Sequence, residues 1–339
     1  MKIDEILKKY NQEQLLSFYN ELNFFKKFKL KKDLKNIDFN LINNLYKNSF
    51  YDEKLDKNKF SFLKCIYNLN KEDIKKYNKI GINLIKNNNY GIVILAGGNA
   101  SRLNLNIPKG CLELNIYNKK ISIFELYINQ LKEIKNKYNI YIPLYIMTST
   151  SNYKDTLNYF KNNNYFNYPK SKIKFFKQND LPILDIKGKI LLKNKYNILF
   201  GPNGNGDVFY SLKNNNLIED MKKKNLKYVL FSTIDNVLSN LIDFNFIGAT
   251  IYNKYKIASK SILKEDSNDK NWVFCKYNNK PSMIPTEYLD DEIMDKKDKN
   301  NNYIYRDKNI TYHLISIDEI EKYSNINLKY HRAYKKIII

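Results

Sequence analysis

The sequence predicts an α/β fold in which a mixed, mostly parallel sheet follows a helical N-terminal segment. Short unbroken apolar runs recur at residues 91–96, 142–147 and 228–232, a pattern typical of strands that are buried on both faces. Helical stretches separate these runs, and strands that alternate with helices form parallel, doubly wound sheets. Because such sheets bind ligands beyond the carboxyl ends of their strands, the loops after the runs are the expected place of a site.

The chain divides into an N-terminal helical segment, residues 1–85, and a larger α/β domain over residues 86–339. Apolar side chains at positions 15, 18, 19 and 22 have the i, i+3, i+4, i+7 spacing, which predicts an amphipathic helix over residues 12–22. In the larger domain we expect helices at 122–138, 153–162 and 217–225 and strands at 142–147, 172–176 and 228–232. Polar residues dominate 253–302, which predicts loops and an extension of the sheet, with strand-like pieces at Trp272–Tyr277 and 303–305.

Composition limits the classes of partner and compartment. The 339 residues carry 58 Lys+Arg against 35 Asp+Glu, a net charge of +23, but the only arginines are Arg102, Arg306 and Arg332. Nucleic-acid sites usually employ arginine forks, so lysine drift on solvated faces is favoured over nucleic-acid binding. The three cysteines have no CxxC spacing, and no apolar run approaches the ~20 residues that span a bilayer. We therefore expect a cytoplasmic monomer that binds neither nucleic acid nor membrane.

Glycine indicates where the site lies. The chain has only ten glycines, and seven of them fall within residues 91–110 and 201–206. Glycine allows backbone conformations and close approaches to a ligand that other residues do not. These two stretches are therefore the candidate functional loops.

The first candidate loop follows the strand at 91–96. Gly97 and Gly98 offer bare backbone N–H groups, while Arg102 and Lys109 add two cations within one loop, as the binding of a polyphosphate requires. The loop matches neither the Walker A nor the G-x-G-x-x-G pattern. An ordinary turn is the plainer alternative, but one of three arginines lies here.

The other two candidates are less specific by themselves. Residues 201–206 combine three glycines with Asn203 and Asn205, whose amides can bond hydroxyls or a base edge, although such a stretch is more often a turn. Asp235 follows the strand at 228–232 and is a natural Mg²⁺ ligand beside a phosphate loop. It could equally cap the following turn through its own backbone, and the residues leave both readings open.

Taken together, the motifs resemble those of eukaryotic-type UDP-N-acetylglucosamine pyrophosphorylases, or UDP-N-acetylhexosamine uridylyltransferases. Residues 95–98, 102–103 and 108–110 are similar to the family signature L-A-G-G-x-x-T-R-L-G…P-K-G. Further similarities follow in the same order over residues 12–336, at 145–149, 175–182, 202–206, 234–236, 287–288, 309–313 and 331–336.

This resemblance implies a nucleotidyltransferase catalytic domain of the Rossmann-like, GT-A-like type and an Mg²⁺-dependent transferase activity. UTP and N-acetylglucosamine 1-phosphate would give UDP-N-acetylglucosamine and pyrophosphate. Arg102 and Lys109 would be catalytic, and Asp235 would hold the metal. The implied nucleotide-binding residues are Leu95, Ala96, Gly97, Gly98, Gln178 and Gly204, and those implied at the sugar are Asn205, Glu287 and Asn309. Because a sugar phosphate is already a competent nucleophile, no histidine base is needed, and His313 and His331 are expected to be structural.

The sequence also departs from the family pattern. Ala100 and Asn104 replace loop glycines, Lys308 replaces another, and Asp207 would place a negative charge near an anion site if it faced inward. The chain ends at Ile339, which predicts that the family's small C-terminal β domain is absent. The alternative function is therefore a catalytically impaired UDP-sugar-binding paralogue.

Overall fold

The computed structural model describes residues 3–48, 55–100, 105, 107–116, 118–264, 272–326 and 330. The chain forms two compact units: the first comprises Met1–Glu53, Asn179–Gly206 and Asn327–Ile339, and the second comprises Lys54–Gln178 and Asp207–Ile326. The predicted boundary at residue 85 does not coincide with any point where the chain passes from one unit to the other. Instead α4 (Lys71–Lys86) packs against α9 (Phe244–Tyr252) within the second unit. No described helix is both long and apolar enough to cross a membrane.

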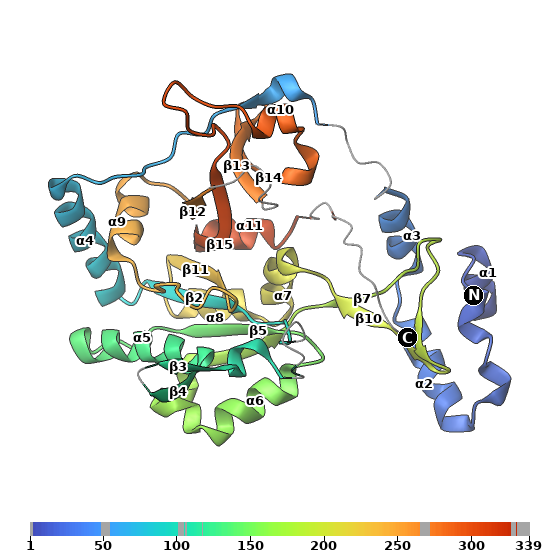
Figure 1. Cartoon of the computed structure of the whole chain (residues 1–339). Helices are drawn as coiled ribbons and strands as arrows, with labels where there is room; N and C mark the ends of the chain where they lie inside the picture. Colours follow the sequence, from blue (N-terminus) through green and yellow to red (C-terminus); the bar gives the residue numbers. More distant parts are fainter. Residues whose placement is uncertain are drawn as a thin grey trace. The chain divides into compact units, whose positions relative to one another are not determined.

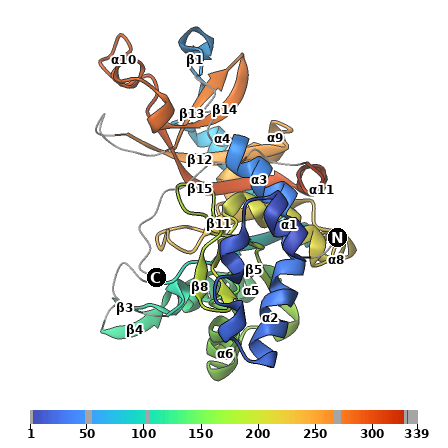
Figure 2. The same ribbon diagram turned by 90° about the vertical axis from the view of Figure 1, so that its right-hand side faces the viewer.

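The first unit packs three helices against short hairpins (Figure 2). Its helices are α1 (Ile3–Lys9), α2 (Phe24–Lys35) and α3 (Phe39–Asn48), and its strand pairs are β7 (Asp180–Pro182) with β10 (Phe200–Pro202) and β8 (Leu192–Asn194) with β9 (Asn197–Ile198). Leu7, Leu30 and Leu34 from the helices share a core with Ile190 and Ile198. Residues far apart in sequence thus build one small core.

The amphipathic α-helix predicted over residues 12–22 is wrong. Two 3-10 turns, Glu13–Leu16 and Tyr19–Glu21, occupy this stretch. The side chain of Gln12 donates to the carbonyl of Gly188 (2.9 Å) and accepts from the amide of Ile190 (2.8 Å). These long-range hydrogen bonds hold the stretch against residues 188–190, so tertiary contacts override the helical pattern.

A nine-stranded sheet of described strands organises the second unit (Figure 1). The order is β1 (Phe60–Ser61), β13 (Trp272–Tyr277), β15 (Asp307–Ser316), β11 (Tyr228–Thr233), β2 (Tyr90–Leu95), β5 (Leu144–Thr148) and β6 (Ile173–Lys177), with β12 (Ile257–Leu263) on β15 and β14 (Lys280–Pro285) on β13. The pairs β11–β2, β2–β5 and β5–β6 are parallel and the remaining pairs are antiparallel. The predicted mixed α/β architecture is confirmed, and β11, β2, β5 and β6 form the parallel part of its sheet.

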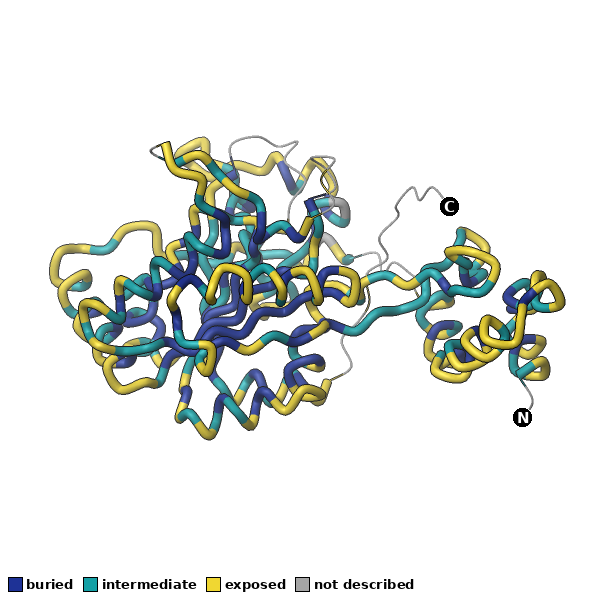
Figure 3. Tube along the Cα trace, turned by 90° about the horizontal axis from the view of Figure 1, so that it is seen from below, coloured by how far each residue is buried: buried dark blue, intermediate teal, exposed yellow. Residues whose placement is uncertain are grey.

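Helices cover both faces of this sheet, and its strands β2, β5 and β11 are almost continuously buried (Figure 3). Alternate residues of β2 point to opposite faces, so Ile92 and Ile94 join one core cluster while Val93 and Leu95 join the other. The first face packs against α4, α5 (Ile123–Tyr138), α6 (Tyr153–Asn162) and α9, and the second packs against α7 (Val208–Asn214), α8 (Leu217–Lys223) and α11 (Ile317–Tyr323).

Most of the elements predicted for this unit are confirmed, with one or two residues of difference at their ends. The strand predicted at 303–305 is wrong, since Tyr303 makes only an isolated bridge with Lys297. Instead β15 begins at Asp307, and its first residues are polar, so no apolar run indicated it. The hairpin β3 (Glu113–Ile116) with β4 (Lys119–Ser122) and the short α10 (Asp291–Met294) complete the unit.

The contact between α4 and α9 depends on two glycines. A Cβ on Gly248 would lie 1.8 Å from the carbonyl oxygen of Tyr77, and one on Gly81 would lie 2.2 Å from that of Phe244. Gly248→Ala should lower the free energy of unfolding by about 2 kcal/mol, because overpacking costs up to ~3 kcal/mol while alanine regains ~1 kcal/mol of helix propensity.

Chemical denaturation measures this effect. Ala249→Ser, which adds one atom at the neighbouring half-buried position, serves as the control and should cost less than ~1 kcal/mol. A Gly248→Ala protein as stable as the parent would contradict the close helix contact.

Candidate active site

The candidate site lies where four strands end at one edge of the sheet. The parallel register pairs Leu95 of β2 with Thr233 of β11 and with Met147 of β5, and Met147 with Phe176 of β6. The segments that follow these four residues therefore leave the sheet side by side. They contain the predicted glycine loop, Gln178 and Asp235, as expected for a parallel sheet.

Main-chain and amide contacts fix the glycine loop. The amide of Ala96 donates to the carbonyl of Met147 (2.7 Å), and the Asn152 side chain donates to the carbonyls of Ala96 (3.0 Å) and Gly98 (3.3 Å). The loop then returns, because the amide of Lys109 donates to the carbonyl of Gly98 (3.2 Å). The backbone of the loop is thus held from two sides.

Lys109 and Asp235 meet at the mouth of this loop. The ammonium of Lys109 lies 2.7 Å from Oδ1 of Asp235, and the two side chains are 31% and 57% exposed. The Lys109 chain runs across Gly98, where a Cβ would lie 3.2 Å from its Cε. The Asp235 carboxylate therefore pairs with a cation of the loop and does not only cap its own turn. Both side chains of the pair remain partly accessible to solvent.

Gln178 lies against Gly97 at the same edge. A Cβ on Gly97 would lie 2.6 Å from Nε2 of Gln178, so only glycine leaves this amide its position. Gln178 itself is 6% exposed, and its backbone amide donates to the carbonyl of Thr148 (2.9 Å). Of the predicted nucleotide-binding residues, Leu95, Ala96, Gly97, Gly98 and Gln178 are therefore brought together beside Lys109.

The remaining predicted site residues are not among those that meet around the glycine loop in the described part of the second unit. Arg102 lies outside the described residues, as does the side chain of Glu287. Gly204 and Asn205 belong to the first unit, so their part in this site stays a prediction. Asn309 lies on β15, where its Oδ1 accepts from the amide of Thr311 (2.8 Å).

Asp207 does not present a free carboxylate. It is 8% exposed, and its Oδ2 accepts a hydrogen bond from the Ser211 hydroxyl (2.5 Å) at the start of α7. The Asp207 carboxylate is therefore buried and hydrogen-bonded to Ser211 of α7.

Asp235 is the residue that fits a metal ion. The described residues contain no group of three or more His, Cys, Asp or Glu side chains that could hold one. Mg²⁺ differs from zinc in this respect, because one or two carboxylates and phosphate oxygens of a substrate suffice. A solvent-accessible carboxylate beside a cationic glycine loop satisfies that requirement.

The described histidine, His313, and the three cysteines all have shifted pKa values. His313 lies within β15, with its Nδ1 2.7 Å from Oγ of Ser259, and burial lowers its pKa to about 4. Burial raises the pKa of the Cys65 and Cys275 thiols to about 11 and that of Cys111 to about 12. His313 is therefore neutral and the thiols are protonated near neutral pH.

Sequence reasoning missed Asn152, which clamps the glycine loop. It precedes α6, where an asparagine usually indicates a helix cap, yet its side chain makes no capping hydrogen bond. Its Nδ2 donates to main-chain carbonyls more than fifty residues away, while its Oδ1 accepts from the nearby amide of Ser149 (2.9 Å). A polar residue shortly after a buried strand was the one signal available.

Comparisons with known proteins agree with this geometry. The family model for UTP–glucose-1-phosphate uridylyltransferase matches residues 38–338. A UDP-N-acetylglucosamine pyrophosphorylase of Saccharomyces cerevisiae is 32% identical over 98% of this chain and 71% of its own length. UDP-N-acetylglucosamine diphosphorylase 2 of Arabidopsis thaliana is 28% identical over 98% of this chain and 70% of its own. The solved uridine diphosphate N-acetylglucosamine pyrophosphorylase of Trypanosoma brucei, 23% identical, superposes with a TM-score of 0.80 over 96% of this chain and 68% of its own.

These similarities define the class of protein first. The fold is that of the UDP-sugar pyrophosphorylases, which are nucleotidyltransferases. More particularly, the chain belongs to the UTP–glucose-1-phosphate uridylyltransferase family, with UDP-N-acetylglucosamine pyrophosphorylases among its relatives. The resemblance that the motifs indicated is confirmed.

The low pKa of His313 predicts a pH dependence of stability. Histidine has an ordinary pKa of 6.5, so below that pH the unfolded chain binds a proton that the folded protein refuses until about pH 4. The stabilisation that comes from keeping His313 neutral is fully present above pH 6.5. It is lost as the pH falls toward 4, and the free energy of unfolding then decreases by at most about 3 kcal/mol.

Unfolding free energies measured between pH 7 and 4 check this expectation against His313→Asn, which lacks the titrating ring. Both proteins retain His331, so their difference isolates position 313. Parallel pH profiles of the two proteins would show that His313 does not cause the loss.

Proposed function

We propose that the protein is an Mg²⁺-dependent uridylyltransferase that converts UTP and N-acetylglucosamine 1-phosphate into UDP-N-acetylglucosamine and pyrophosphate. The observation that carries this proposal is the meeting of Lys109 and Asp235, 2.7 Å apart, beside the Gly97–Gly98 loop and Gln178. The 32% identity with the yeast pyrophosphorylase supports the substrate pair.

The reaction needs charge neutralisation and alignment more than acid–base chemistry. A phosphate oxygen of the sugar phosphate bonds to the α-phosphorus of UTP, and the bond from that phosphorus to the oxygen bridging the β-phosphorus breaks. Pyrophosphate leaves with the electron pair, and no proton has to move. Among the described residues, His313 is neutral and the Cys111 thiol is protonated near neutral pH, which suits a reaction that moves no proton.

Lys109 and Asp235 would exchange partners when the nucleotide binds. Lys109 would turn from the carboxylate to phosphate oxygens, and Asp235 would then hold the metal together with the same phosphates. Bound Mg²⁺ supplies neutralisation of the charge on the transferring phosphoryl group. In the free protein the ion pair holds the two side chains together at the mouth of the loop.

The nucleotide would bind where Gly97 and Gly98 leave the backbone bare. The Gln178 amide, which both donates and accepts, would recognise the polar edge of uracil. Arg102 would add a second cation to the triphosphate, Gly204 would contact the nucleotide, and Asn205, Glu287 and Asn309 would bind the sugar. The three free cysteines support a reducing, cytoplasmic location.

One argument for the alternative function, a catalytically impaired UDP-sugar-binding paralogue, is not supported by the structure. It required Asp207 to turn a negative charge toward the anions, whereas its carboxylate is buried and bonded to Ser211. We therefore favour the active enzyme.

Pyrophosphate release tests the proposed function. Purified protein with UTP and Mg²⁺ should release pyrophosphate with N-acetylglucosamine 1-phosphate, and parallel reactions with N-acetylgalactosamine 1-phosphate and glucose 1-phosphate rank the sugars. UTP binding in calorimetry without turnover of any of the three would establish the paralogue instead.

Substitution of the ion pair provides the second test. Lys109→Ala and Asp235→Ala should each lower kcat/KM by about 100-fold or more, since Lys109 would stabilise the phosphoryl charge directly and Asp235 would hold the metal that does so. Measured rates decide the outcome, and unchanged rates in either variant would remove that residue from the mechanism.

The same unit offers a matched control. Lys222 and Glu321 form an ion pair of 2.5 Å with side chains that are 36% and 46% exposed, close to the values for Lys109 and Asp235. Lys222→Ala and Glu321→Ala should leave kcat/KM within about twofold of the parent, because exposed pairs contribute little to stability.

A further inference from the structure

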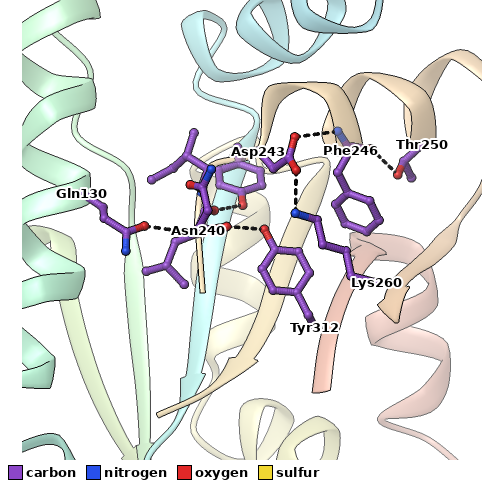
Figure 4. A network of polar contacts seen from close by, with 10 residues as sticks. Gln130, Asn240, Asp243, Phe246, Thr250, Lys260 and Tyr312 are labelled. Carbon is purple, nitrogen blue, oxygen red and sulfur yellow. Dashed lines mark hydrogen bonds and ion pairs between the residues drawn. The ribbon is translucent and has the colours of Figure 1, made fainter. Parts of the chain in front are cut away.

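Asp235 lies in an irregular segment, residues 234–243, that connects β11 to α9. Irregular backbone near a core needs partners for its N–H and C=O groups. Side chains from α5, β2 and β15 provide them, and Figure 4 shows part of this network around Gln130, Asn240 and Tyr312. The position of the Asp235 carboxylate therefore depends on residues outside its own segment.

Tyr127 of α5 holds the part of the segment that carries Asp235. Its hydroxyl lies 2.7 Å from the carbonyl oxygen of Asn236 and 3.2 Å from that of Thr233. These carbonyls bracket Asp235 in the chain. The Tyr127 side chain is 1% exposed, so its hydroxyl cannot exchange these partners for bulk water.

Other anchors act farther along the segment. Gln130 accepts from the amide of Leu241 (2.8 Å) and donates to the carbonyl of Ser239 (3.0 Å). Tyr90 donates to the carbonyl of Leu241 (2.6 Å), and Tyr312 donates to that of Asn240 (2.6 Å). Three buried tyrosines thus bind one segment by the same chemistry, and Tyr127 alone among them contacts the residues that flank Asp235.

We propose that Tyr127 is a positioning residue for the metal-binding carboxylate of Asp235. This inference rests on the proposed function, because it concerns the metal that the uridylyltransferase would use. Without the hydroxyl, the carbonyls of Thr233 and Asn236 keep the turn amides of Asn236 (3.4 Å) and Ser239 (3.0 Å) but lose the donor that ties them to α5, so the turn can shift. Because a ligand's affinity for metal depends on the groups that orient it, the shift weakens metal binding at Asp235.

Calorimetric titration of UTP, with Mg²⁺ and with EDTA, measures the metal's contribution apart from turnover. Tyr127→Phe should lose about 10-fold in UTP affinity with Mg²⁺, a change typical of groups that orient a metal ligand. Affinity with EDTA should stay unchanged. The same site filled by 4-fluorophenylalanine, which keeps the size of the hydroxyl but donates no hydrogen bond, should behave alike and covers the case in which Tyr127→Phe does not fold.

Tyr90→Phe and Tyr312→Phe are the matched controls. Both tyrosines are as buried as Tyr127 and lose one hydrogen bond to the same segment. They should lower the melting temperature as Tyr127→Phe does, yet leave the Mg²⁺-dependent affinity intact. An equal loss in either control would reduce Tyr127 to a stabilising residue and overturn the proposal.

A double-variant comparison checks that the effect passes through Asp235. In an Asp235→Ala background, Tyr127→Phe should cause no further loss of Mg²⁺-dependent affinity, since effects of coupled residues do not add. A full additional loss would refute the proposed route.

The two hypotheses fail separately in this design. Mg²⁺-dependent UTP binding that responds to Tyr127 without pyrophosphate release would reject the uridylyltransferase and keep the positioning role. Turnover by the parent with an unaltered Mg²⁺ response in Tyr127→Phe and in the fluorinated protein would reject the positioning role and keep the enzyme.

Discussion

The parallel pairing of β2 with β11 is the constraint on which the candidate site depends. Its register places Leu95 beside Thr233, so the glycine loop and the Asp235 turn leave the sheet at the same point. Lys109 and Asp235 are 126 positions apart in the chain, yet this pairing lets them form one ion pair. A slip by one residue would also turn every β2 side chain to the wrong face, so the two hydrophobic clusters and the site are specified together.

The glycines that indicated the site serve two physical purposes. Gly97 leaves room for the Gln178 amide, and Gly98 lets the Lys109 side chain cross the backbone. Gly110 instead allows close packing, because a Cβ there would lie 2.2 Å from the Phe124 ring. Glycine scarcity thus indicated a loop that follows a buried parallel strand, although part of the signal comes from close packing beneath that loop.

The sequence was most informative where local pattern and burial coincide. Apolar runs predicted β5 and β11, and the helix predicted at 153–162 has the same bounds as α6. It failed where distant groups decide, as at Gln12, whose contacts with residues 188–190 replace a helix by 3-10 turns. Asn152 and Tyr127 were missed for the same reason, since each donates to carbonyls of remote segments that composition and spacing do not reveal.

The core of the first unit has a consequence for the order of folding. It joins Leu7 and Leu30 near the start of the chain with Ile190 and Ile198, while the second unit lies between and around these segments in sequence. Contacts of such wide separation form slowly, because long loops must close first. During synthesis from the N-terminus, α1 and α2 therefore emerge long before the isoleucines that complete their core. Until residues 179–206 have left the ribosome, the helices lack the part of their core that Ile190 and Ile198 supply, and a chaperone could bind the uncovered apolar surface in that interval.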